Sequence, residues 1–112
     1  MPKLTPKPAT AKTKKPAAPK LPPKRLRALG NAWTLDAKGK TLIGIFPFSR
    51  YLDAFLFATR ITVYAEVQRH YPEICITREQ VKVILQTPTI GFVTTEDLEM
   101  AERINRIIST RP

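Results

Sequence analysis

The sequence predicts an α+β domain with the element order β-β-α-β-β-α, in which a four-stranded, mostly antiparallel sheet carries its helices on one face. Two segments without glycine or proline, 50–69 and 95–108, show helical apolar spacing. Short segments rich in β-branched or aromatic residues precede each of them. The 112 residues are about the length of one domain.

The first two strands form a predicted hairpin. Residues 33–35 and 41–48 have the composition of strands, and Gly39 between them can adopt a positive φ. Pro47 is expected at the end of the second strand or at a sheet edge. Ser49 is then expected to cap the long helix.

The long helix is expected over residues 50–69, ending before Pro72. Helical spacing predicts one wide apolar face, made by Leu52, Leu56, Val63 and Val67 together with Tyr51, Phe55 and Ala58.

The second half of the chain repeats the pattern. Two further strands are expected at 74–76 and 81–85. Along the second, Val81, Val83 and Leu85 alternate with Lys82 and Ile84, which fits a sheet whose one face is covered by helices. Thr94 and Asp97 have the spacing of a capping box at the start of the second helix.

Residues 1–29 differ from the rest. They hold nine Lys and Arg, seven prolines and no acidic residue, whereas residues 30–112 are nearly neutral. Such a segment can bury little apolar surface, so we predict a disordered basic Pro/Lys/Ala-rich tail at 1–29 and a folded domain at 30–112. The tail either only aids solubility or attracts an acidic partner. A protein partner is favoured over nucleic acid, because the tail has no aromatic residue for base stacking.

The composition bears on disulfides, metal sites, membrane spans and targeting segments. Cys75 is the single cysteine, so an intramolecular disulfide and a multi-thiolate zinc site are excluded. No apolar run reaches the ~18 residues of a membrane-spanning helix, and the N-terminus lacks a signal-peptide core. The acid-free tail leaves an organelle transit peptide open, but we expect a cytoplasmic protein.

The motif of interest is Arg69-His70-Tyr71-Pro72, followed by Gln86-Thr87-Pro88-Thr89. His70 is the single histidine, so chemistry that needs several imidazoles is unavailable. The favoured interpretation of His70 is a structural residue at a helix end, with Glu66 one turn earlier as a candidate partner.

An ordered set of residues between 33 and 108 resembles the pterin-4a-carbinolamine dehydratases. The matching positions are Phe46-x-Phe48-x-x-Tyr51-x-x-Ala54-x-x-Phe57, Ala65-Glu66, His70-Tyr71-Pro72, Val81-Lys82-Val83, Leu85-x-Thr87, Gly91, Thr94 and Asp97-x-x-x-Ala101.

The resemblance implies a degenerate pterin site comprising His70, Tyr71, Pro72, Pro88 and Phe92. His70 matches the first catalytic histidine of the family, whereas Tyr71 and Pro88 stand where the second and third are expected. A tyrosine, with an ordinary pKa near ~10, is a poor base at neutral pH, and proline offers no side-chain donor or acceptor. We therefore expect no catalytic residue, no metal and no cofactor.

This combination looks like the pterin dehydratase-like RuBisCO assembly factors of bacteria with α-carboxysomes. The resemblance implies a non-enzymatic chaperone for the RuBisCO large subunit or its assembly intermediates, cytoplasmic or carboxysome-associated. Free sheet edges favour a homodimer. The candidate partner-binding residues are Tyr71, Arg69, Lys24, Arg25 and Arg27.

Two alternatives remain open. One is a residual or altered 4a-hydroxytetrahydrobiopterin dehydratase. The other is a dimerisation cofactor or nucleic-acid-associated module, in which the basic tail would contact nucleic acid.

Overall fold

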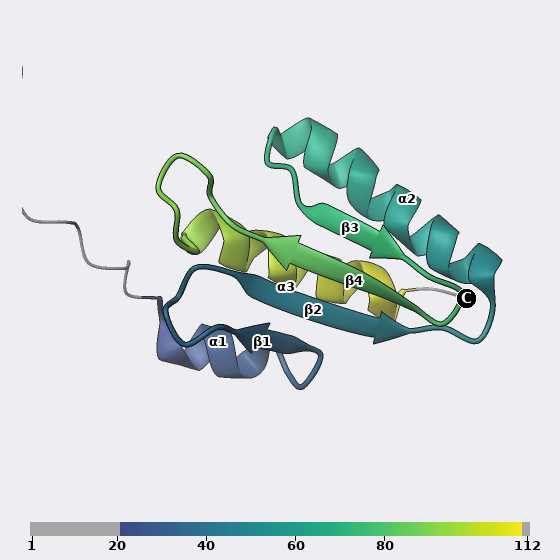
Figure 1. Ribbon diagram of the computed structural model, residues 1–112, viewed down its shortest axis with the longest axis horizontal. Coiled ribbons are helices and arrows are strands. Elements are labelled where there is room, and N and C mark those ends of the chain that lie inside the picture. The colour runs from purple at the N-terminus through teal and green to yellow at the C-terminus, as the bar shows by residue number, and fades with distance from the viewer. Residues whose placement is uncertain (1–20, 111–112) are drawn as a thin grey trace, which may run out of the picture.

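The computed structural model describes residues 21–110 as three helices and four strands (Figure 1). In chain order they are α1 (Pro23–Ala28), β1 (Trp33–Leu35), β2 (Leu42–Pro47), α2 (Tyr51–Gln68), β3 (Glu73–Ile76), β4 (Gln80–Leu85) and α3 (Thr95–Ser109). The predicted α+β class and the order of the four strands and two long helices are confirmed.

The strands form one antiparallel sheet in the order β1-β2-β4-β3. In the central pair, Gly44 lies opposite Val83 and Leu42 opposite Leu85. Alternate residues of β4 are fully buried, as period-two spacing requires when helices cover one face.

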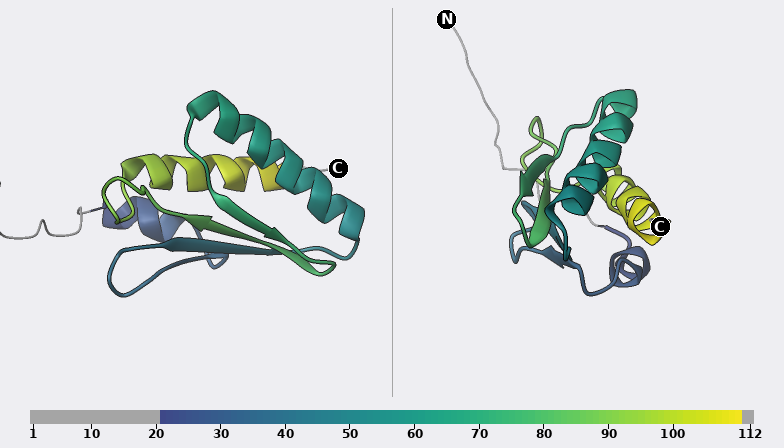
Figure 2. Two further views of the ribbon diagram at one scale, coloured as in Figure 1. Left: turned by 45° about the horizontal axis from the view of Figure 1, so that its top comes forward. Right: turned by 90° about the vertical axis from the view of Figure 1, so that its right-hand side faces the viewer.

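Both long helices lie on the same side of the sheet (Figure 2). The core between the layers contains an aromatic chain, in which the Phe46 ring centroid lies 5.5 Å from that of Trp33 and 5.2 Å from that of Phe57. Leu98 and Ile104 of α3 are fully buried in the same core.

Helix α1 corrects the predicted boundary at residue 29. Pro23 occupies the first turn, where its missing amide costs nothing. Arg25 donates two hydrogen bonds to the Glu102 carboxylate of α3, at 2.9 and 2.7 Å, and Leu29 is buried in the core. The disorder predicted for residues 21–29 is therefore wrong, while residues 1–20 lie outside the described residues.

Helix α2 is turned the opposite way from the prediction. Its inner face is made of Ala54, Phe57, Ala58, Ile61 and Ala65. Small alanines on this face allow a close approach to the layers below. Of the residues predicted to form one packed face, only Ala58 is buried.

Most of the apolar side chains predicted to pack instead point outwards. Five of them are between 50% and 73% exposed and fall within one arc of the helix; we call them the outer stripe: Leu52, Phe55, Leu56, Val63 and Val67. The predicted cap is also wrong, because Arg50 occupies the cap position and no side chain bonds the first-turn amides.

Candidate functional site

The way α2 ends creates the histidine turn. Arg69 follows the last helical residue in a left-handed conformation, with a φ of 54°. The backbone amides of Arg69 and His70 both donate to the carbonyl oxygen of Ala65, the latter at 3.2 Å. This turn ends the helix and places His70 beside the start of α3.

His70 contacts α3 rather than α2. Its Nε2 donates to Oδ1 of Asp97 at 2.5 Å, and its Nδ1 lies 3.9 Å from the carboxylate of Glu96. Asp97 is completely buried, and 14% of the His70 side chain is exposed. The pairing of His70 with Glu66 is not formed, because Glu66 accepts a hydrogen bond from Tyr71.

Asp97 is the centre of a buried polar network. Its Oδ2 accepts from the Thr87 hydroxyl at 2.8 Å and from the Thr94 backbone amide at 2.9 Å. The two threonine hydroxyls are 2.8 Å apart. The bond to the Thr94 amide belongs to the predicted capping box, which the structure confirms. The network therefore joins the end of α2, the segment after β4 and the start of α3.

Thr87 and the second role of Asp97 were missed in the site predicted from the sequence. The capping-box spacing accounts for one carboxylate oxygen of Asp97 and leaves the other unassigned. Asp97 lies in a helix that was expected to pack against the sheet, and a buried carboxylate oxygen needs a hydrogen-bond donor. Its second oxygen therefore indicated that a donor from another part of the chain lies nearby.

Tyr71 points away from this network. Its hydroxyl donates to Glu66 at 3.0 Å, and the residue is 60% exposed. The hydrogen bond to Glu66 raises the pKa of the phenol, and partial desolvation and the negative charge of Glu66 act in the same direction. Tyr71 is therefore still less suited to act as a base than an ordinary tyrosine.

Pro88 and Phe92 contribute no side-chain hydrogen bond to the network of His70, Asp97, Thr87 and Thr94. Pro88 is exposed in the segment after β4, and Phe92 is half-buried, with its carbonyl accepting from the Thr87 amide at 3.3 Å. Pro72 is half-buried where the turn enters β3. Of the predicted degenerate site, only His70 joins the buried network.

The space beside His70 is small. A cavity of about 90 Å³ lies between the end of α2 and the start of α3, lined by Tyr64, Gln68, His70, Glu96, Glu99 and Met100. Pockets that hold small organic ligands are roughly 300–1,000 Å³. The cavity is thus too small to enclose a two-ring ligand.

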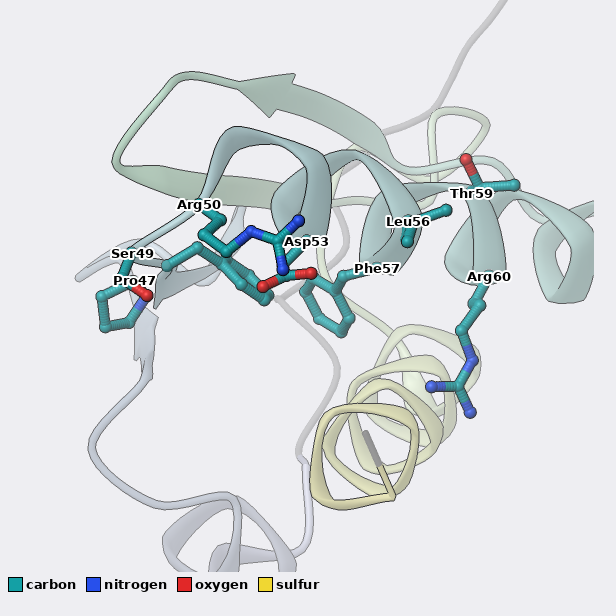
Figure 3. A pocket seen from close by; sticks show the side chains of 9 residues that line it. Pro47, Ser49, Arg50, Asp53, Leu56, Phe57, Thr59 and Arg60 are labelled. Carbon is teal, nitrogen blue, oxygen red and sulfur yellow. The ribbon is translucent and has the colours of Figure 1, made fainter. Parts of the chain in front are cut away.

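A larger cavity, of about 750 Å³, lies at the other end of α2 (Figure 3). The buried rings of Phe48 and Phe57 lie 5.4 Å apart in its lining. Arg50, Asp53 and Arg60 supply charged groups around them.

The predicted basic contact residues have different roles. Arg25 is occupied by Glu102, whose hydrogen bonds raise the pKa of the guanidinium. Lys24 and Arg27 are exposed on α1, and Arg69 is exposed at the end of α2. Their part in binding a partner stays a prediction.

Within residues 21–110, no group of three or more His, Cys, Asp or Glu side chains has an arrangement that could hold a metal ion. None of the helices in that range is both long and apolar enough to cross a membrane.

Similar sequences are found among dehydratases. A protein of Bradyrhizobium diazoefficiens, provisionally named pterin-4-alpha-carbinolamine dehydratase, is 37% identical over 91 residues, which cover 79% of this chain and 90% of that protein. A provisionally named counterpart from Haloarcula marismortui is 35% identical over 79 residues, covering 70% and 84% of the two chains.

Two solved structures share the fold. A transcriptional coactivator/pterin dehydratase from Brucella melitensis has a TM-score of 0.69 and 32% identity, covering 76% of this chain and 89% of that chain. A pterin dehydratase-like protein identified as a RuBisCO assembly factor in the alpha-carboxysome has a TM-score of 0.61 and 19% identity, covering 74% and 96%. Residues 16–107 also match the family model described as pterin 4 alpha carbinolamine dehydratase. The chain therefore belongs to the pterin 4 alpha carbinolamine dehydratase family.

Proposed function

We propose that this chain is a non-enzymatic assembly factor for RuBisCO, built on a pterin dehydratase scaffold. The observation that carries the proposal is the outer stripe of α2, which exposes five large apolar side chains over a helix of 18 residues. Contiguous apolar surface of this kind is typical of protein-binding sites.

The chemistry of the histidine site supports a role without catalysis. Dehydration of a carbinolamine needs a base to remove a proton and an acid to protonate the leaving hydroxyl. His70 is the single imidazole of the chain, and its Nε2 already bonds the buried Asp97. Tyr71 holds its proton more tightly than an ordinary tyrosine because of Glu66.

RuBisCO as the client rests on the shared fold and on the degenerate site, since the assembly factor of the alpha-carboxysome has the same architecture. In this proposal the outer stripe covers apolar surface on the large subunit or an assembly intermediate, and basic residues such as Lys24 and Arg27 add electrostatic attraction.

Co-expression tests this proposal. RuBisCO subunits are produced with and without this protein, and assembled holoenzyme is quantified by native electrophoresis and carboxylation activity. We expect a higher yield with the parent chain and none of that gain with Val63→Glu, which places a charge in the outer stripe. Ala37→Glu adds the same charge to an exposed turn and should behave as the parent. Equal yields with and without the protein would refute the role.

A residual dehydratase is the second candidate, favoured by the His70–Asp97 pair and by the names of the relatives. Turnover of synthetic carbinolamine by the purified protein is the direct measurement. A rate typical of a working dehydratase, lost in His70→Gln, would establish this candidate and exclude a purely non-enzymatic role.

A further inference from the structure

The large cavity at the start of α2 is separate from the histidine site. It lies beside the first turns of a helix of 18 residues, whereas His70 follows the last turn, about 27 Å away along the helix axis. Its volume of about 750 Å³ falls in the range that holds a small organic group.

The inner part of the cavity is apolar and aromatic. Phe48 and Phe57 are 9% and 5% exposed, so their rings form a fixed surface rather than mobile surface side chains. Leu56, which belongs to the outer stripe, also lines the cavity and adds to its apolar surface. A flat or branched apolar group can pack here without disturbing the core.

Charged groups surround the aromatic surface, and Figure 3 shows the Arg50 and Asp53 side chains beside Phe57. Arg60 points towards α3, where its guanidinium donates to the Thr110 hydroxyl at 2.9 Å and the Ile107 carbonyl oxygen at 3.4 Å. No carboxylate of residues 21–110 lies within ion-pair distance of Arg50. Two guanidinium groups and one carboxylate leave one excess positive charge.

We propose that this cavity binds an aromatic or aliphatic carboxylate, with its apolar part on Phe48 and Phe57 and its carboxylate paired with Arg50. The excess charge, and an Arg50 guanidinium without an ion pair among residues 21–110, favour a single anionic group, and the apolar lining favours a hydrophobic body. The same chemistry is presented by a free organic acid and by the last residue of a peptide.

Titrations followed by amide nuclear magnetic resonance test the site, with matched probes that differ only in charge. The first pair is indole-3-acetate and indole-3-acetamide. The second is acetyl-Gly-Gly-Trp with a free carboxyl group and the same peptide as its amide. We expect shifts in the amides of residues 48–60, and each acid should bind more tightly than its amide. The tighter acid identifies a free metabolite or a peptide end as the source.

Two variants test whether Arg50 pairs with the carboxylate of the bound probe. Arg50→Gln should weaken binding of each acid by roughly two- to fivefold, as the loss of a partly exposed ion pair does, and should leave the amides unaffected. Lys38→Gln removes a positive charge from the turn that precedes β2, whereas the cavity begins at Pro47 at the end of that strand, so it should change the affinity of neither the acids nor the amides. Equal affinity for acids and amides, shifts confined to residues 63–70, or no shift at millimolar probe would each overturn the proposal.

Discussion

Asp97 shows how a single buried carboxylate can organise the region around His70. One oxygen accepts from His70, and the other accepts from Thr87 and the amide of Thr94. A buried acid is tolerated when its charge is paired and its lone pairs are used. Here the imidazole completes a set of hydrogen bonds that also caps α3.

Removing this carboxylate should be costly. We expect Asp97→Ala to lower the free energy of unfolding by about 2–4 kcal/mol, because it leaves buried donors of His70 and Thr87 without an acceptor. Urea denaturation measures the loss. Glu96→Ala removes the neighbouring acid, which is 71% exposed, and should stay within about 0.5 kcal/mol of the parent. Equal losses in the two variants would contradict a structural role for the network.

At the scale of elements, β2 lies very close to the aromatic core. An added Cβ at Gly44 would be 2.8 Å from the Trp33 ring, whose Nε1 donates to the Asn105 side chain at 2.8 Å. Asn105 in turn donates to the Leu29 carbonyl oxygen at 3.0 Å. The glycine thus permits a contact that connects the first hairpin to α3 and to the end of α1.

Gly44→Ala should therefore displace Trp33. We expect a loss of about 1–3 kcal/mol in the free energy of unfolding, typical of overpacking, with a change in tryptophan fluorescence in the folded state. Thr34→Ala changes an exposed residue of the same hairpin and should leave the fluorescence unaltered. A Gly44→Ala variant with parental stability and fluorescence would show that the ring has room to move.

The docking of α1 should depend on pH through Glu102. Hydrogen bonds from Arg25 hold the pKa of this carboxyl below its ordinary value. A carboxyl with a lowered folded-state pKa stabilises the fold above its unfolded-state pKa, about 4.3, and this contribution is lost as the pH falls through the folded-state pKa.

Glu102→Gln should consequently lower stability at pH 7 by about 0.5–1 kcal/mol, a modest value because solvent screens the partly exposed pair. The difference from the parent should shrink towards zero at pH 3. Urea denaturation at both pH values measures it, with Glu79→Gln as an exposed control. A deficit that persists at pH 3 would mean that packing rather than charge holds α1.

For the whole molecule, sequence periodicity predicted the sheet better than the orientation of α2. A strand has only two faces, so the alternation of Val81, Val83 and Leu85 identifies which face of β4 is buried. In α2, Leu52 and Ile61 are equally apolar, and only the packing of the alanine face decides which is buried. His70 and Asp97 are 27 residues apart, so no local sequence pattern predicted their hydrogen bond.

We propose that the expected homodimer forms along β3. This strand is one of the two edges of the sheet, and Cys75 is exposed on it. If two copies pair along this edge, Cys75→Lys should weaken the dimer in sedimentation velocity, because like charges then approach across the interface. Val63→Glu should leave the dimer intact if the outer stripe binds the client, as proposed above. The reverse pattern would place self-association on α2.

The bond between His70 and Asp97 has a consequence for which residues of this region can be substituted. The side chains at positions 71 and 88 are exposed, so we expect substitutions there to cost little stability. Substitution of His70 would instead leave Oδ1 of the buried Asp97 without this partner, so stability alone favours retaining the imidazole. A structural role is therefore sufficient to explain the single histidine of the chain, because its hydrogen bond to Asp97 joins the end of α2 to the start of α3.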